Sequence, residues 1–176
     1  MKKLFHITNL VFICTVLFIG NVYSSNASKS FNEGVRAART GNIDVAYMYF
    51  SDVLRNNPEP KLAQEALFAI GEYYFCTNAY NYSYTAFKDL IFDCDNDLTK
   101  LFALAYQFEI AKKDNMKARL KEIEKEIATF QKITFLFRDF KEHTYESPMN
   151  KRYKAKHFID KIEFYIDEIF FSEVPY

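Results

Sequence analysis

A pattern of small and aromatic residues occurs twice between residues 34 and 95 of this 176-residue chain, and it restricts the fold more than any other feature. Each copy has a glycine, a small residue twelve positions later and a phenylalanine four positions after that: Gly34, Ala46 and Phe50, then Gly71, Ser83 and Phe87. A sequence that repeats at such a period is typical of helix–turn–helix units stacked into a solenoid. Repeats of this kind build binding surfaces rather than reaction centres.

Apolar residues at helical spacing predict the helices of these units. We expect them at residues 30–39, 43–55, 61–76, 80–92 and 98–112, within a repeat region that covers residues 31–113. Gly71 lies inside the third helix, where glycine costs about 1 kcal/mol relative to alanine, so we expect a close helix crossing there. Ala105 follows Gly71 by 34 residues and begins a third, incomplete repeat. The chain has only four glycines and four prolines, which disfavours a β-sandwich or barrel.

After Asp114 the repeat pattern ends, and one long amphipathic helix is expected within residues 114–142. Its apolar residues recur every three or four positions: Met116, Leu120, Ile123, Ile127, Phe130, Ile133 and Phe137. The other face is charged, as in a helix with one face in solvent. We expect this helix to cap the last repeat, because the terminal unit of a solenoid must cover its open face. A coiled-coil partner helix, through which the chain would form an oligomer, is the alternative.

Residues 143–176 form a C-terminal element of different composition. Residues 162–167 alternate between apolar and polar, apart from Tyr165, and residues 169–174 are rich in β-branched and aromatic types. This pattern predicts a β-hairpin with its turn near Asp167 and Glu168, although that pair is a weak hairpin turn. Isoleucines at helical spacing leave a helix as the alternative.

The first 24 residues are predicted to be a signal peptide. Two lysines precede an apolar run at residues 10–20, which is too short for a membrane helix of about 20 residues, and small residues follow. Cleavage is expected after Ser24 or Ala27, and residues 25–30 are expected to be a tether. The mature chain is therefore expected in a bacterial periplasm or outside the cell; an uncleaved membrane anchor is the alternative.

The charges and cysteines limit the partners and the cross-links. Lysine and arginine balance aspartate and glutamate at 23 each, which does not favour a nucleic-acid partner. The basic segment 151–156 is expected to be a solvated loop rather than a phosphate-binding patch.

In the expected helix pair, Cys76 and Cys94 are about 15 Å apart along the helix axis. A disulfide needs Cα atoms within about 7 Å, so we predict none between them.

Motifs that carry chemistry are weak in this chain. The aspartates at 93, 95 and 97 resemble the start of a calcium loop, but Leu98 and Leu104 stand where the glycine and the last acidic ligand are needed. The segment is expected to be a turn that caps the next helix through Asp95–Asp97. His143 and His157 are not part of a metal-ligand motif. We therefore expect no catalytic site, metal or cofactor.

Residues 31–112 resemble tetratricopeptide-repeat (TPR) proteins, in particular those of the bacterial periplasm and of outer-membrane assembly. The residues that carry the resemblance are 66–74 and 84–91. It implies a mainly α fold: a TPR-like α-solenoid of about two and a half repeats, followed by the long helix and the hairpin. It also implies a concave groove lined by the first helix of each pair, with the following candidate residues: Phe31, Val35, Glu65, Phe68, Glu72, Phe75, Phe102, Tyr106 and Glu109. Aromatic and acidic residues together suit a partner segment with apolar and basic side chains. The alternative is that the long helix fills the groove.

These observations favour an exported, non-enzymatic interaction scaffold that binds another protein of the bacterial envelope and serves envelope assembly or maintenance. The alternative is a cell-wall-active hydrolase, or its regulatory subunit, with a site in the C-terminal part. His143, His157 and nearby acidic residues are the only candidates for such a site.

Overall fold

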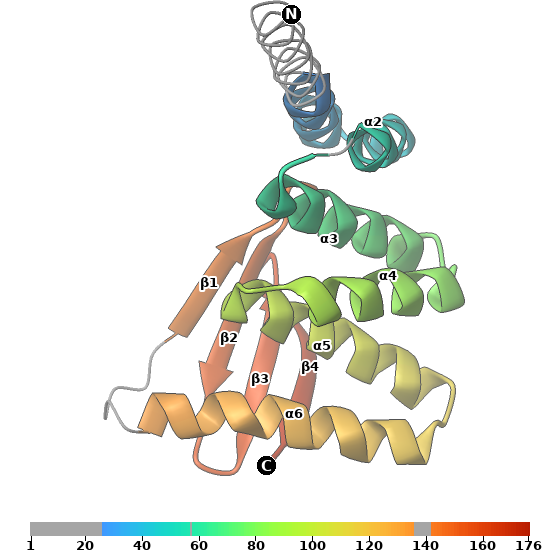
Figure 1. Cartoon of the computed structure of the whole chain (residues 1–176). Coiled ribbons are helices and arrows are strands. Elements are labelled where there is room, and N and C mark those ends of the chain that lie inside the picture. Colours follow the sequence, from blue (N-terminus) through green and yellow to red (C-terminus); the bar gives the residue numbers. More distant parts are fainter. Residues whose placement is uncertain (1–25, 57, 136–141) are drawn as a thin grey trace, which may run out of the picture.

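The computed structural model describes residues 26–56, 58–135 and 142–176, and every side chain among them except those of residues 131–135. It contains a stack of helices followed by one antiparallel sheet (Figure 1). Residues 26–39 are helical, and the later helices are α2 (Ile43–Arg55), α3 (Pro60–Cys76), α4 (Tyr80–Asp93), α5 (Asp97–Lys113) and α6 (Lys117–Phe135). The mainly helical architecture predicted from the sequence is confirmed.

The repeated glycine–phenylalanine pattern corresponds to the same contact in two helix pairs. A Cβ atom built on Gly34 would lie 2.9 Å from Cε1 of Phe50, and one built on Gly71 would lie 2.7 Å from Cζ of Phe87. Each glycine thus allows the phenylalanine of the next helix to approach its backbone. In the second pair the Oγ of Ser83 also donates a hydrogen bond to the carbonyl oxygen of Gly71, at 2.9 Å. The predicted close crossing at Gly71 is confirmed.

Substituting Gly71 with alanine should destabilise the protein, although alanine is the better helix former. The Phe87 ring is fully buried and stacks on Tyr106 with centroids 4.7 Å apart, so it has little room to retreat from a new methyl group. Overpacking costs about 1–3 kcal/mol, which exceeds the ~1 kcal/mol gained in helix propensity. Urea denaturation should show a net loss of up to about 2 kcal/mol in the free energy of unfolding. In a Phe87→Leu background the same substitution should cost little; stabilisation by the single variant would contradict the crossing.

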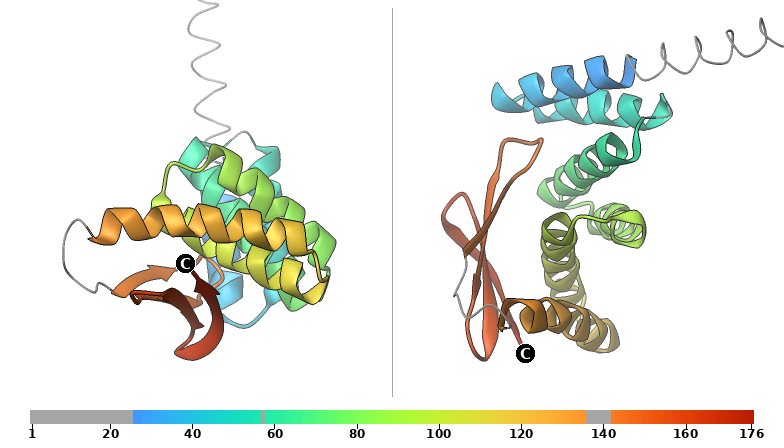
Figure 2. Two further views of the ribbon diagram at one scale, coloured as in Figure 1. Left: turned by 90° about the horizontal axis from the view of Figure 1, so that it is seen from below. Right: turned by 60° about the vertical axis from the view of Figure 1, so that its left-hand side comes forward.

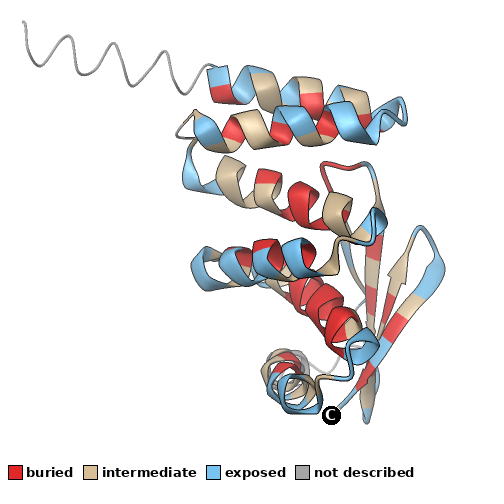
Figure 3. Ribbon diagram, turned by 90° about the vertical axis from the view of Figure 1, so that its right-hand side faces the viewer, coloured by how far each residue is buried: buried red, intermediate tan, exposed pale blue. Residues whose placement is uncertain are grey.

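Helix α5 lies at the centre of the molecule. Eleven of its seventeen residues are buried, so it has no polar face of the kind that a surface helix presents (Figure 3). Helices α4 and α6 pack against it, and strands β1 and β4 also contact it. The side chain of Asn96 caps its first turn by accepting hydrogen bonds from the backbone N–H groups of Leu98 and Thr99. The predicted cap within Asp95–Asp97 is therefore confirmed, and Asn96 is the residue that supplies it.

The sheet has four strands in the order β1-β2-β3-β4, all antiparallel: β1 (Glu142–Glu146), β2 (Arg152–His157), β3 (Lys161–Ile166) and β4 (Ile169–Pro175). It stands along one side of the helical stack (Figure 2). One face of β2 and β3 is buried, and its residues belong to the same hydrophobic cluster as α5: Tyr153, Ala155, Ile162 and Phe164. Helices and sheet therefore share one core.

The predicted hairpin is confirmed as β3 and β4, with its turn at Asp167 and Glu168. Both residues have positive φ (51° and 65°), as a tight two-residue hairpin turn requires. Two hydrogen bonds tie this turn to β2: the Arg152 N–H donates to Oδ1 of Asp167 at 2.9 Å, and the Asp167 N–H donates to the Arg152 carbonyl at 2.8 Å. The neighbouring strand thus supports a turn that is weak by sequence alone.

Three expectations need correction, and two predicted regions reach beyond the described residues. Residues 26–30, expected to be a tether, are helical, and Ala27 is fully buried. The segment 142–157, for which no strands were predicted, forms β1 and β2, so the basic residues 151–156 are not a solvated loop. The sheet, not the long helix, lies against the helices where the groove was expected. Helix α6 is described to Phe135, and residues 136–141 and the predicted signal peptide, residues 1–24, lie outside the described residues.

Candidate functional site

The groove predicted on α3 and α5 is closed by the sheet. Phe68 and Phe102 are at most 1% exposed, and their rings contact aromatic rings of the strands. The centroids of Phe68 and Tyr153 are 5.6 Å apart, those of Phe102 and Phe164 are 6.0 Å apart, and those of Phe102 and Tyr153 are 5.1 Å apart. The side chains expected to receive a partner are therefore in the core, because the sheet supplies the aromatic surface that they pack against.

The other candidates are divided between this interface and the first helix pair. Tyr106 is 1% exposed, and its ring centroid lies 5.0 Å from that of Phe171 on β4. The ring centroid of the half-buried Phe75 lies 5.8 Å from that of Phe171. Glu109 accepts a hydrogen bond from the Oγ of Ser172 at 2.6 Å. Three candidates lie outside these contacts: Phe31 and Val35 pack half-buried in the core of the first pair, and Glu65 is half-buried.

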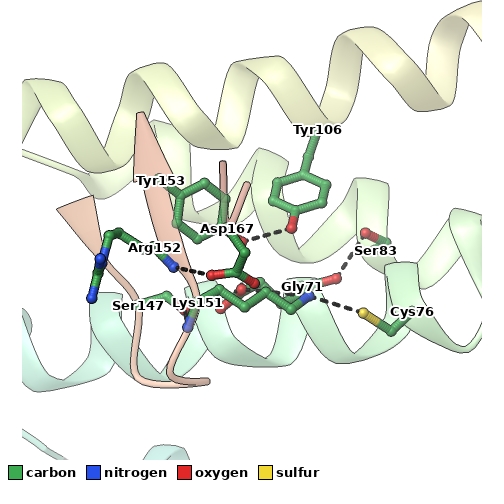
Figure 4. A network of polar contacts seen from close by, with 10 residues as sticks. Gly71, Cys76, Ser83, Tyr106, Ser147, Lys151, Arg152, Tyr153 and Asp167 are labelled. Atoms are coloured by element: carbon green, nitrogen blue, oxygen red, sulfur yellow. Dashed lines mark hydrogen bonds and ion pairs between the residues drawn. The ribbon is translucent and has the colours of Figure 1, made fainter. Parts of the chain in front are cut away.

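Glu72 is the centre of a buried polar network between α3 and the sheet. Figure 4 labels its partners Tyr153, Ser147 and Lys151. Its Oε1 accepts hydrogen bonds from the hydroxyl of Tyr153 and, at 3.1 Å, from the Oγ of Ser147. The Tyr106 hydroxyl lies 2.6 Å from that of Tyr153, and it is the donor there because the Tyr153 proton is directed to Glu72. The Nζ of Lys151 is 3.9 Å from Oε1. The network joins α3 and α5 to the β1–β2 turn and to β2.

Burial dominates the electrostatics of this network. It raises the pKa of Glu72 from 4.5 to about 7, against the opposing effects of Lys151, Tyr153 and Ser147. Burial, and then the charge of Glu72, raise the pKa of Tyr153 and Tyr106 well above the ordinary tyrosine value. Oε2 of Glu72 is buried and has no hydrogen-bond partner among the described residues. An ionised Glu72 is therefore costly, and the protonated form is favoured below neutral pH.

At its outer end the network reaches the surface through Lys151 and Cys76. The Nζ of Lys151 lies 3.0 Å from the Sγ of Cys76, which is the last residue of α3 and is exposed. Cys94 is half-buried, and its sulfur faces Oε1 of Gln64 and the Asn96 carbonyl instead. Both cysteines are free, so the prediction that they do not pair is confirmed.

The histidines at 143 and 157 lie together, although no pattern in the sequence indicated it. His143 on β1 and His157 on β2 have ring centroids 5.2 Å apart. His157 is buried, its Nδ1 lies 3.1 Å from the Tyr176 hydroxyl, and burial followed by the charge of His143 lowers its pKa to about 4. His157 is thus a neutral element of the core near neutral pH. The described residues contain no group of three or more potential metal ligands.

The outer face of the sheet is charged but balanced. Arg152, Lys154 and Lys156 alternate with the buried residues of β2, so they share the face turned away from the helices. Lys154 pairs with Glu168 at 2.6 Å, and Lys156 pairs with Glu142 at 3.6 Å. A phosphate-binding patch is therefore not favoured, because carboxylates already offset much of the positive charge.

Four tyrosines from three successive helices form a surface cluster, which we call the tyrosine patch: Tyr47 of α2, Tyr73 and Tyr74 of α3, and Tyr82 of α4. Tyr47 stacks on Tyr73 with centroids 4.3 Å apart, and its hydroxyl lies 2.8 Å from that of Tyr74. Tyr73 donates a hydrogen bond to Asp44 at 2.8 Å. Tyr82 lies 5.3 Å from Tyr74 and is 67% exposed. Sequence reasoning missed this patch because its members are up to 35 residues apart and follow no single period.

Comparison with protein-family models, curated proteins and solved structures gives no match for this chain. Within the part of the chain that the structure describes, no helix has both the length and the apolar character needed to cross a membrane. The functional argument therefore depends on the geometry of the chain itself.

Proposed function

We propose that this protein is an exported, non-enzymatic interaction module with a TPR-like stack of helix pairs, and that it binds a protein partner through the tyrosine patch. The observation that carries the proposal is the patch itself. Tyrosine is enriched at protein interfaces because one side chain offers both a large apolar ring and a hydroxyl. Export is inferred from residues 1–24 alone, and a role in bacterial envelope assembly or maintenance follows from the resemblance of residues 31–112 to envelope TPR proteins.

The patch suits recognition because its side chains are already ordered. Ring stacking and hydrogen bonds join Tyr47, Tyr73 and Tyr74, so a partner would not have to immobilise them. The hydrogen bond between the two hydroxyls is the main cause that raises the pKa of Tyr74 to about 12, so Tyr74 belongs to the ordered part of the patch. Met48 is 67% exposed and Val45 is 45% exposed on α2, so the helix that carries Tyr47 also presents apolar surface.

The closed groove supports the use of another surface. In TPR-like stacks a partner is expected on the concave face, and here the chain places its own aromatic strands against α3 and α5. Glu72 has the raised pKa that is common in active sites, but it is completely buried among groups of the same chain. We therefore assign Glu72 to holding the sheet on the helices and not to an active site for an external substrate.

Site-directed photo-crosslinking in the host cell tests the proposal. A photoreactive phenylalanine analogue in place of Tyr82 should give a discrete crosslinked partner. The same analogue in place of Phe92, which is 88% exposed near the other end of α4, should not. Tyr82→Ser together with Met48→Ser should reduce partner capture about tenfold or more, because exposed apolar anchors carry much of an interface's energy.

The matched control for this experiment is Phe92→Ser, which removes an even more exposed ring from the same helix. Thermal unfolding should show that all these variants keep the parent melting temperature, since the side chains that they change are mostly solvent-exposed. Equal crosslinking from positions 82 and 92, or capture unchanged by the double substitution, would refute the patch as the binding surface.

A further inference from the structure

We propose that Cys76 and Lys151 form a covalent sulfur–nitrogen bond under oxidation by a peroxide, which locks the sheet onto the end of α3. The two reacting atoms, Sγ and Nζ, are already 3.0 Å apart. They belong to residues 75 positions apart in the sequence, so the bond would join the helical stack to the β1–β2 turn. This modification is independent of partner binding at the tyrosine patch.

The surroundings of Cys76 and Lys151 suit both the oxidation of the thiol and the attack of the amine on the oxidised sulfur. Cys76 is exposed at the end of α3, so a small oxidant can reach its sulfur. The side chain of Lys151 is only 24% exposed, and its Nζ contacts both the buried Glu72 and the exposed Cys76. Burial alone would lower the pKa of Lys151, but Glu72 and Cys76 outweigh it and raise the pKa, so the amine needs a base before it can react.

Glu72 is placed to act as that base. Its carboxylate lies 3.9 Å from the Nζ of Lys151, it is fully buried, and its Oε2 has no hydrogen-bond partner among the described residues. With a pKa of about 7, this carboxylate is partly ionised at neutral pH and binds a proton more tightly than an exposed glutamate does. A buried carboxylate oxygen without a hydrogen-bond partner is costly in a purely structural contact, and the Oε1 of the same carboxylate is near enough to Lys151 to take up its proton.

The reaction has two balanced steps. Hydrogen peroxide oxidises the Cys76 thiol by two electrons: the O–O bond breaks, an S–O bond forms, and one water leaves, which gives a sulfenic acid. The Lys151 ammonium then transfers a proton to Glu72, and the lone pair of its nitrogen attacks the sulfur. The S–O bond breaks as the S–N bond forms, and the hydroxyl leaves as a second water with the next nitrogen-bound proton. The protein has lost two hydrogen atoms once Glu72 returns its proton to solvent.

Peptide mapping of the full chain after peroxide treatment tests the proposal. Mass spectrometry should show the peptides that contain Cys76 and Lys151 joined, with a mass loss of two hydrogen atoms and no added oxygen. The linkage should be absent from Lys151→Arg and Cys76→Ser, retained in Cys94→Ser, and formed at least about tenfold more slowly in Glu72→Gln, because the base is lost. A thiol reductant should reverse it.

A second measurement on the wild-type chain does not depend on the variants. The linkage closes a long loop of the unfolded chain, so treated protein should melt several degrees higher and return to its original melting temperature after reduction. The sulfur–nitrogen bond would be overturned if oxygen atoms were added to Cys76 in equal yield in wild type and in the Lys151→Arg variant. It would also be overturned if the joined peptides retained an extra oxygen. An unlinked Cys76 in treated wild-type protein would overturn it as well.

Discussion

Replacing Phe68 with alanine should lower the free energy of unfolding by about 3–5 kcal/mol. Phe68 has no exposed surface, and its ring lies between a helix pair and the sheet. Its centroid is 5.4 Å from that of Phe87, 5.2 Å from that of Tyr145 and 5.6 Å from that of Tyr153. Truncation leaves a cavity that neither the helices nor the sheet can fill unless the two move relative to each other. Urea denaturation followed by circular dichroism measures the loss.

Phe92→Ala is the matched control, because it removes the same ring from a side chain that is 88% exposed. This control should change the free energy of unfolding by less than about 0.5 kcal/mol. The Phe68 variant distinguishes the closed groove from the open one that the sequence suggested. A near-normal stability for Phe68→Ala would mean that its ring faces solvent and that the sheet does not pack on α3.

Replacing Glu72 with glutamine should also change the free energy of unfolding strongly, by an amount that depends on pH. The pKa of Glu72 is about 7 in the folded protein and 4.5 in the unfolded chain, so the folded state holds more protons between these values. The free energy of unfolding therefore falls as the pH rises from 4.5 to 7. The total fall is about 3 kcal/mol, at 1.36 kcal/mol for each pKa unit. Glutamine stays neutral, so the variant should gain about 3 kcal/mol relative to wild type between pH 4 and pH 8.

Comparing the variant with wild type at each pH removes the contributions of other groups. His157 is the group whose titration overlaps most with that of Glu72. Its lowered pKa makes the free energy of unfolding rise between pH 4 and 6.5. In the wild-type profile alone, this rise partly hides the fall caused by Glu72. Glu163→Gln is the control: its pKa is lowered by Lys161 on the outer face of the sheet, so that variant should lose stability relative to wild type with rising pH. Parallel profiles for Glu72→Gln and wild type would contradict the buried, uncompensated carboxylate.

The helices were predictable because their signals are local. Helix α2 covers residues 43–55 as expected, and α3, α4 and α5 begin and end within one residue of the predicted positions. The contacts of Gly34 with Phe50 and of Gly71 with Phe87 were implied by equal spacings within adjacent helices. The hairpin was predictable for the same reason, since alternation along a few residues and a short turn define it.

The candidate site was only partly predictable. Glu72 and Tyr106 were selected as groove residues from helical position, and the structure brings them together, but under a sheet. Strand β2 was missed because its charged residues resembled a solvated loop; the alternation of Arg152, Lys154 and Lys156 with Tyr153 and Ala155 was the signal that would have found it. The partners of Glu72 in the β1–β2 turn and on β2 follow it by 75 and 81 residues, beyond the reach of any local pattern.

By itself the sequence determined where the chain is helical, where the helices turn, and which glycines allow close packing, since hydrophobic period and steric size act between near neighbours. The tertiary structure alone decided which surface is free to bind. Phe68 and Phe102 have the same apolar character whether a partner or the chain's own sheet covers them, and only long-range packing distinguishes the two. Packing also determines the chemistry of Glu72, because burial and not residue type sets its pKa.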